Sequence, residues 1–226
     1  MRYAMHESDA TDGRLFDAER GCELFTQRTV SLAGAVEPPA ADEVLYVLEG
    51  GGTARIDGGD HVLAPGTALF LSSGTPWQLD GEVRAVSVLV HGADPSDVSH
   101  AVVDLEAVET GNATAGRQFL LGLTPESGCA SVTQFIGLVP PGRAPDHFHT
   151  YDEVIYVLEG EGTLFIGGEE AELRPGTCVH LPARLVHCLA NTGETELRLL
   201  GVFRPAGSPA EAYYPDGTLA VLPTKE

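Results

Sequence analysis

The chain has 226 residues, of which 43% are hydrophobic, and a formal net charge of −20. This length is enough for one large domain or two small domains, each with its own core. Lys225 is the only lysine. Such an acidic chain is expected to repel nucleic acid and anionic membrane surfaces, which excludes most proteins of those two classes.

The N-terminus is acidic, whereas a secretory signal would be basic and then apolar. The sequence also lacks the run of about 18 apolar residues that a membrane-spanning helix needs. Its cysteines form no Cys-x-x-Cys pair, which is typical of reduced thiols in a cytosolic protein. We therefore expect a cytoplasmic protein.

One string occurs twice along the chain, as DEVLYVLEG at 42–50 and as DEVIYVLEG at 152–160. When residues 42–77 are laid over 152–187 without a gap, close to half of the positions are identical. A period this long is typical of two domains, because solenoid repeats are much shorter. The sequence therefore predicts one fold written twice.

Each copy is predicted to consist of short strands separated by glycine-containing turns. The predicted strands of the two copies are 44–48, 53–56 and 83–90, then 154–158, 163–166 and 196–203. One more strand is expected at 118–123, and residues 206–226 are aromatic enough to pack against the fold. Because no long stretch has a helical apolar period, the prediction is an all-β fold, of sandwich or barrel type, with little helix.

The residues that predict chemistry surround the second string only. His147 and His149 are two positions apart, which on a strand places both imidazoles on one face. Glu153 follows at an even step, and His187 comes from a later strand. Three neutral imidazoles and one carboxylate suit a divalent ion of Mn, Fe, Co, Ni, Cu or Zn. An octahedral ion held by these four ligands would keep two positions open for substrate or oxygen.

The two stretches around these ligands resemble the two motifs of the cupin superfamily. The resemblance implies two tandem jelly-roll (double-stranded β-helix) barrels and one divalent metal bound by His147, His149, Glu153 and His187. It has two departures: Gly142 is one residue closer to His147 than is common, and Arg184 stands where glycine is usual. The expected boundaries are an N-terminal barrel at 1–91, a linker with a connecting strand at 92–128, and a C-terminal barrel with a tail at 129–226.

The first copy lacks most of these ligands. The ungapped alignment places Glu37, Pro39, Glu43 and Trp77 at the four ligand positions. Of the four ligands only the carboxylate at Glu43 is kept, and Glu37, Pro39 and Trp77 supply no imidazole, so the N-terminal barrel is predicted to be metal-free. Either Trp77 fills the space of a ligand, or Trp77 and Glu43 line a pocket for an organic ligand.

Four further residues are candidates for the substrate pocket or for support of the metal ligands: Gln134, His180, Asp146 and Arg184. Each has an ordinary alternative, such as a solvated side chain or a structural histidine. For the whole protein, the resemblance favours a metal-dependent enzyme that acts on a small organic molecule, with an oxidoreductase of dioxygenase type preferred. A pair of barrels in one chain is compatible with a monomer or a homodimer. The alternatives are a non-redox isomerase, lyase or hydrolase, and a protein that binds a metal or small ligand without catalysis.

Overall fold

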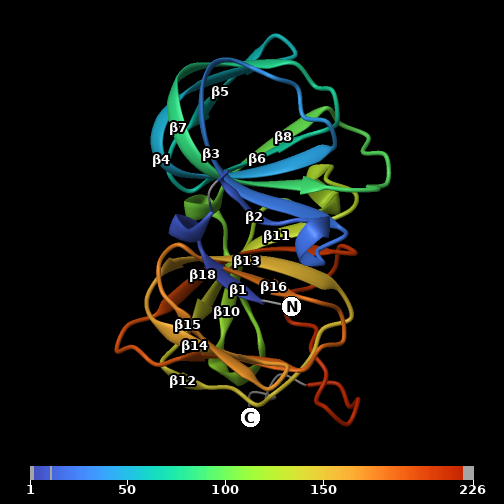
Figure 1. The fold of residues 1–226 in the computed structure, drawn as a ribbon. Helices are drawn as coiled ribbons and strands as arrows, with labels where there is room; N and C mark the ends of the chain where they lie inside the picture. The colour runs from blue at the N-terminus through green and yellow to red at the C-terminus, as the bar shows by residue number, and fades with distance from the viewer. Residues whose placement is uncertain (1–2, 11, 221–226) are drawn as a thin grey trace. The chain divides into compact units, whose positions relative to one another are not determined.

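The computed structural model describes residues 3–10 and 12–220. Within this part, the chain forms β-strands and 3-10 turns of three residues each, with no α-helix. The predicted all-β fold with little helix is thus confirmed, and the strands curl into two barrels (Figure 1). Helices of the length and hydrophobicity that a bilayer-spanning segment requires are absent from the described residues.

The N-terminal barrel is built from residues 10–108 and 122–132. Its strands follow the order β2-β3-β7-β4-β6-β8, and β5 pairs with β4. All of these pairings are antiparallel. The strands are β2 (Arg14–Phe16), β3 (Phe25–Val36), β4 (Asp42–Ile56), β5 (Gly59–Leu63), β6 (Thr67–Leu71), β7 (Trp77–Val90) and β8 (His100–Asp104).

The C-terminal barrel contains residues up to Asp9, residues 109–121 and residues from Thr133 onward. One sheet has the order β1-β16-β13-β18-β11-β10-β9, and the other has the order β12-β17-β14-β15. The strands of the first sheet are β1 (Ala4–His6), β9 (Thr110–Asn112), β10 (Gln118–Leu121), β11 (Thr133–Val139), β13 (Asp152–Glu159), β16 (Thr177–Leu181) and β18 (Leu197–Arg204). Those of the second are β12 (Gly142–Arg143), β14 (Gly162–Ile166), β15 (Glu169–Leu173) and β17 (His187–Asn191).

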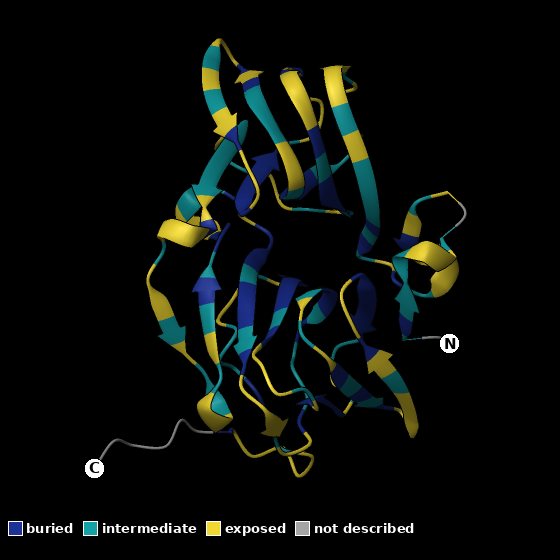
Figure 2. Cartoon of the chain, turned by 90° about the vertical axis from the view of Figure 1, so that its left-hand side faces the viewer, coloured by how far each residue is buried: buried dark blue, intermediate teal, exposed yellow. Residues whose placement is uncertain are grey.

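Side-chain alternation places the repeated carboxylate inside each barrel. Ile155 and Val157 of β13 belong to the buried core of the C-terminal barrel. Glu153 lies two residues before Ile155, so its side chain faces the same way. The same alternation places Glu43 of β4 on the core side of the N-terminal barrel, because Leu45 belongs to that core. Figure 2 shows buried residues along many strands, and exposed residues both in the turns and on some of the strands.

The glycine that ends each repeated string has a steric reason. Gly160 adopts a left-handed φ of 86°, and a Cβ atom there would lie 2.7 Å from the carbonyl oxygen of Glu196. Gly50 has a φ of 81° at the matching position. Just before this glycine, the strand register of both strings shifts, between Val47 and Glu49 in the first and between Val157 and Glu159 in the second. The repeat therefore preserves a bend of the barrel wall.

In each barrel an added strand pairs with β6 or with its repeat equivalent, β16, and this added strand comes from a different part of the chain in the two barrels. In the N-terminal barrel, β8 is the last strand along the chain and pairs with β6. In the C-terminal barrel, β16 is the repeat equivalent of β6, and its partner is β1, from the start of the chain. The boundaries therefore differ from those expected: residues up to Asp9 and residues 109–121 belong with the C-terminal barrel, whereas 122–132 belong with the N-terminal one.

Candidate metal centre

Three histidines meet at the start of β17. His147 and His187 pair as an isolated antiparallel bridge, with backbone N···O distances of 3.0 and 2.8 Å. His149 is two residues beyond His147, and the ligand atoms of all three side chains lie within 4.8 Å of one another. In the described part of the chain, this is the one cluster of three or more His, Cys, Asp or Glu side chains with the spacing of a metal site.

Every imidazole of the cluster is held by its Nδ1 atom. The Nδ1 atoms lie 3.0, 2.7 and 2.8 Å from backbone carbonyl oxygens of Pro145, Glu211 and Leu185, for His147, His149 and His187 respectively. A carbonyl oxygen only accepts, so each Nδ1 carries the proton and each Nε2 keeps its lone pair. The Nε2 atom of His187 is buried without a hydrogen-bond partner. A metal ion would satisfy it, so the donor set fits the metal that the resemblance implies.

Burial keeps the three imidazoles neutral. It lowers the pKa of His149 to about 3, with the neighbouring His147 as the second cause. Burial also lowers the pKa of His147, and it moves the pKa of His187 well below its ordinary value. Because the neutral imidazole is the form that binds a metal, protons compete weakly for this site at neutral pH.

Glu153 lies in the same cavity as the imidazoles but outside the cluster of three. Its side chain is buried, and burial raises its pKa to about 8, although the charge of Arg117 acts in the opposite direction. Its Oε1 atom lies against β18, where a Cβ atom at Gly201 would come within 2.8 Å of it. A buried carboxylate of this kind gains from a nearby cation.

The cavity beside the histidines has a volume of about 70 Å³ and a largely apolar wall. Aromatic rings of Phe119, Phe135 and Tyr151 line it together with His147, His149 and Glu153. The ring of Tyr151 stacks on that of His149, with centroids 4.7 Å apart and an interplanar angle of 7°. This volume admits only a small ligand, and the rings restrict the water around it.

Arg117 is a residue of this cavity that the sequence did not single out. It precedes β10, lines the cavity, and donates from Nη2 to the carbonyl oxygen of Leu189 at 2.6 Å. Burial lowers the pKa of its guanidinium, while Cys188 and Glu153 act to raise it. Its only sequence signal is the scarcity of basic residues, which number 13 against 33 acidic ones. A desolvated guanidinium beside metal ligands is suited to bind an anion.

The segment after β18 covers the cavity. Pro209 and Ala212 line it, and Glu211 supplies the carbonyl oxygen that holds His149. Tyr213 pairs with Phe148 through both backbone N–H groups, at 2.9 Å, and their rings stack with centroids 5.5 Å apart. The expectation that the C-terminal tail packs against the fold is therefore confirmed for its described residues, which end at residue 220.

The other predicted pocket residues lie elsewhere. Gln134 is buried on β11, on the strand face opposite to Phe135, which lines the cavity. His180 pairs with Asp152 at 3.1 Å. Asp146 forms an exposed ion pair with Arg143 at 3.1 Å. For Asp146 the structure thus has the ordinary alternative, a solvated side chain, and backbone carbonyl oxygens hold the three imidazoles.

Arg184 keeps the turn that its motif requires. Its φ is 63°, the left-handed conformation that favours glycine, and its backbone N–H donates to the carbonyl oxygen of His149 at 2.7 Å. This hydrogen bond offsets part of the strain, on the order of 1 kcal/mol, of a side chain in that conformation. Its side chain lines a different cavity, beside Asp146 and Phe165. Arg184 thus acts here through its backbone.

In the N-terminal barrel, a cation of the protein itself lies beside the repeated carboxylate. Arg28 pairs with Glu43 at 3.1 Å, and Ser87 also donates to Glu43. Trp77 is buried among the core side chains. The strand register places Val36 opposite Trp77, as His147 is opposite His187. The ungapped alignment was therefore wrong by one residue at Glu37, which is exposed, because the connection to the next strand is one residue longer in the first copy.

Comparison with known proteins gives one family match. Residues 135–203 match the cupin domain model. A 46-residue segment is 46% identical to quercetin 2,3-dioxygenase of Bacillus subtilis and covers 20% of this chain and 14% of that protein. The polyketide synthase CurC of Streptomyces cyaneus is 31% identical over 102 residues, 44% of this chain and 66% of that protein. The alignments with these two relatives thus span less than two thirds of either protein.

Solved structures agree on the fold. Oxalate decarboxylase of Bacillus subtilis aligns with a TM-score of 0.71 at 12% identity, over 90% of this chain and 77% of that one. A putative glyoxylate-induced protein of Pseudomonas aeruginosa aligns with a TM-score of 0.66 at 22% identity, over 80% of this chain and 73% of that one. Residues 135–203 are thus a cupin domain within the C-terminal barrel, and the chain as a whole has the fold of these two solved structures.

Proposed function

We propose that the C-terminal barrel binds one divalent transition metal through His147, His149 and His187, with Glu153 as the fourth ligand. One observation carries the proposal: the Nδ1 atom of each of the three imidazoles is hydrogen-bonded to a backbone carbonyl oxygen. The three Nε2 atoms are therefore free to bind a metal, and the three side chains cluster together. Relatives in this superfamily include proteins named as a dioxygenase and a decarboxylase, which supports a metal-dependent role.

We further propose that the protein is an enzyme acting on a small anionic organic molecule. Arg117 would bind the anionic group of the substrate, because its guanidinium lines the cavity beside the histidines. Phe119, Phe135 and Tyr151 would exclude water from it. Glu153 would hold or release a proton at a carboxyl oxygen, which its raised pKa of about 8 suits. The bound metal would supply Lewis acidity or redox chemistry.

The preferred reaction class is oxidation by O₂, of dioxygenase type, in line with the most similar short segment among the relatives described above. The second candidate is non-redox chemistry, supported by the small cavity and by the alignment with a decarboxylase. Oxygen uptake with a panel of small carboxylates and enolisable acids separates the two. Turnover that is equally fast without O₂ would assign the non-redox class, and metal binding without any turnover would assign a binding protein.

Metal analysis tests the site itself. We expect about one Mn, Fe, Co, Ni, Cu or Zn ion per chain to remain after gel filtration, and we expect it to be lost in His147→Ala and His187→Ala. Trp77→Ala is the matched control, because it changes the repeat-equivalent position in the other barrel. Retention of metal by both histidine variants would refute the proposed ligands.

A spectroscopic titration tests the substrate class. Acetate or oxalate is expected to change the EPR spectrum of the Mn²⁺-loaded protein, and Arg117→Gln is expected to weaken this effect about tenfold or more, in keeping with a lost charge-assisted pair. Arg143→Gln is the control, since Arg143 lies in an exposed ion pair. Equal titrations of all three proteins would contradict the role of Arg117.

A further inference from the structure

A second group of polar side chains lies at the seam between β5 and β8 of the N-terminal barrel. His61 of β5 and His100 of β8 approach each other with their Nε2 atoms 3.1 Å apart. Their rings meet edge to face, with centroids 4.8 Å apart and an interplanar angle of 70°. Each histidine lies two residues before a side chain that packs in or against the core, and both are only partly buried. The pair therefore lies where the core meets solvent.

The neighbours of His100 determine which of its ring nitrogens carries the proton. Ser99 donates its single hydroxyl proton to the carboxylate of Asp57, so its oxygen accepts from Nδ1 of His100, 3.0 Å away. Nδ1 of His100 therefore carries the proton, and its Nε2 accepts a hydrogen bond from Nε2 of His61, so a shared metal ion would take the place of the proton between the two rings. This arrangement, in which a hydroxyl and a carboxylate hold an imidazole by Nδ1, is the one that orients histidines in metal sites.

The distance between the two Nε2 atoms fits a shared metal ion. With metal–nitrogen bonds of about 2.0–2.1 Å, a separation of 3.1 Å gives an N–metal–N angle of roughly 100°. That angle lies between the octahedral and the tetrahedral values. Imidazole pairs select Zn²⁺, Ni²⁺ or Cu²⁺ over Mg²⁺ or Ca²⁺. Water would complete the coordination, so the site is weaker than one with three histidines and a carboxylate.

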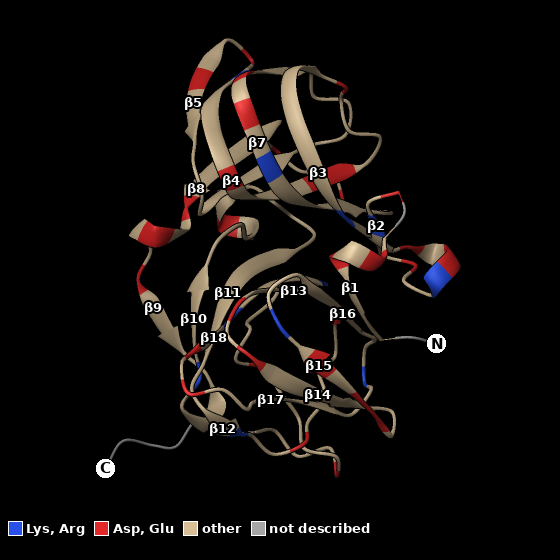
Figure 3. Cartoon of the chain, turned by 60° about the vertical axis from the view of Figure 1, so that its left-hand side comes forward, with Lys and Arg blue, Asp and Glu red and all other residues tan. Residues whose placement is uncertain are grey.

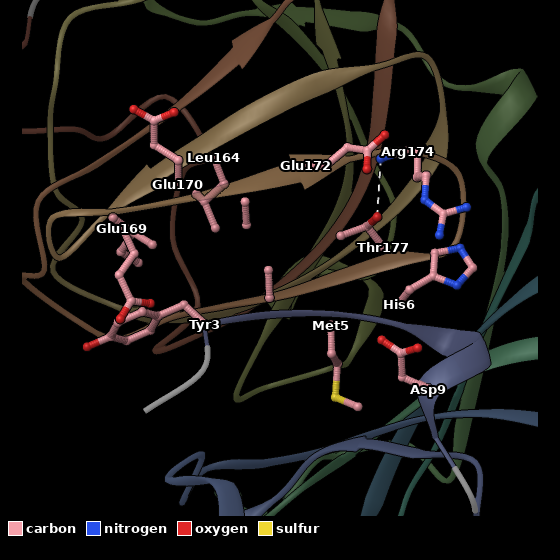
Figure 4. A pocket seen from close by; sticks show the side chains of 13 residues that line it. Tyr3, Met5, His6, Asp9, Leu164, Glu169, Glu170, Glu172, Arg174 and Thr177 are labelled. Carbon is pink, nitrogen blue, oxygen red and sulfur yellow. Dashed lines mark hydrogen bonds between the residues drawn. The ribbon is translucent and has the colours of Figure 1, made fainter.

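The same seam is open in the other barrel. There, β1 and β15 take the places of β8 and β5, and a cavity of about 390 Å³ lies between them (Figure 4). The repeat places Ala171 where His61 stands, so no imidazole is available on β15. Glu169, Glu170 and Glu172 make this strand acidic instead (Figure 3). The histidine pair is thus a property of the N-terminal barrel and not of the repeat.

We propose that His61 and His100 form a divalent transition-metal site that joins the edge strands β5 and β8. It is separate from the C-terminal metal centre, and it lies in the barrel that has lost the metal ligands of the superfamily. The ligand class is a borderline cation such as Ni²⁺ or Zn²⁺, held by two imidazoles and water.

Calorimetric titration of the full chain with Ni²⁺ tests this site, after the tightly held metal has been loaded. We expect a further, weaker equivalent that His61→Ala and His100→Ala each abolish. Ser99→Ala keeps both imidazoles and should weaken the site about tenfold. His91→Ala is the control, because this histidine of the same barrel bonds Thr26 at 2.8 Å and not another histidine.

Two results would overturn the proposal: wild-type protein that binds no further Ni²⁺, or His61→Ala and Ser99→Ala that both bind it as the wild type does. Circular dichroism of each variant establishes that it is folded, and His61→Ala and Ser99→Ala still decide the question if His100→Ala is not. Failure of the C-terminal centre to bind metal would leave this test intact, because the dependence on His61 is read separately.

Discussion

At the scale of single residues, the repeated buried carboxylate has different neighbours in the two barrels: Glu43 has polar partners in the first, and Glu153 has a ring and a glycine at the equivalent positions in the second. Strand register makes Ser87 and Gly201 equivalent, since they lie opposite Leu45 and Ile155. By the same argument Arg28 corresponds to Phe135, because Arg28 lies opposite Ser87 and Phe135 lies opposite Gly201. In the N-terminal barrel, therefore, Glu43 has a guanidinium and a hydroxyl as permanent partners.

The C-terminal barrel has a ring and a glycine in those places. Burial therefore disfavours the ionised form of Glu153, and its pKa rises to about 8. In the first barrel an internal cation, Arg28, thus lies beside the repeated carboxylate. The second barrel keeps a carboxylate that is unfavourable until a cation arrives.

This difference predicts that Glu153→Gln stabilises the metal-free protein at alkaline pH. An unfolded glutamate ionises near its ordinary value of 4.5, whereas folded Glu153 holds its proton up to about pH 8. Wild-type stability is therefore lost as the pH rises from 4.5 to 8, and the variant does not share this loss. The relative gain should reach on the order of 4 kcal/mol by pH 8 and vanish near pH 4.5.

Urea unfolding in the presence of a chelator, at pH 5 and pH 8, measures this gain. Glu43→Gln is the matched control: it removes the partner of Arg28 and is expected to destabilise the protein at both pH values. If the stability difference between Glu153→Gln and wild type were the same at pH 5 and pH 8, Glu153 would not carry the ionisation cost.

At the scale of elements, the tail after β18 is part of the proposed metal centre. It provides the carbonyl oxygen of Glu211 to His149, and its Tyr213 pairs with Phe148, between two of the metal ligands. Thr150 also donates to the carboxylate of Glu211, at 3.3 Å. The tail therefore fixes one metal ligand and closes the cavity at the same time.

A chain that ends at Ser208 should lose metal affinity by about 10- to 100-fold, the usual cost of removing the group that orients a ligating histidine. Competition with a chromophoric chelator measures the affinity. A chain that ends at Ala220 is the control, because it keeps every contact described here. An unchanged affinity in the shorter chain would show that the tail covers the site without positioning His149.

The sequence predicted those elements whose patterns are local. The repeated string, its glycine and the His-x-His pair indicated two barrels and one ligand set, since alternation and turn chemistry act over a few residues. The pairing of β1 with β16 joins residues far apart in the chain, and three residues such as Ala4–His6 carry too little pattern to reveal it. Arg117, which bonds Leu189, and Glu211, which holds His149, likewise contact residues far away in the chain.

At the scale of the whole molecule, the chain consists of two units with separate cores, and the proposed tight metal site belongs to one of them. The N-terminal core gathers around Leu45, Leu69 and Trp77, and the C-terminal core around Ile155 and Leu164. The proposed tight site lies entirely within the C-terminal unit. A metal that binds only the folded form of that unit should stabilise it and leave the other unchanged.

The single tryptophan makes this prediction measurable, because Trp77 is buried in the core of the N-terminal barrel. We expect chelation of the tight metal to leave the melting temperature read from Trp77 fluorescence unchanged. Calorimetry should show a second transition that falls by several degrees, since a ligand present at about 1,000 times its Kd contributes roughly 4 kcal/mol. His187→Ala should show the lower transition with or without added metal. A Trp77 transition that moves with chelation as far as the calorimetric one would mean that the two barrels unfold as a single cooperative unit, so that the metal of one barrel stabilises the fold of both.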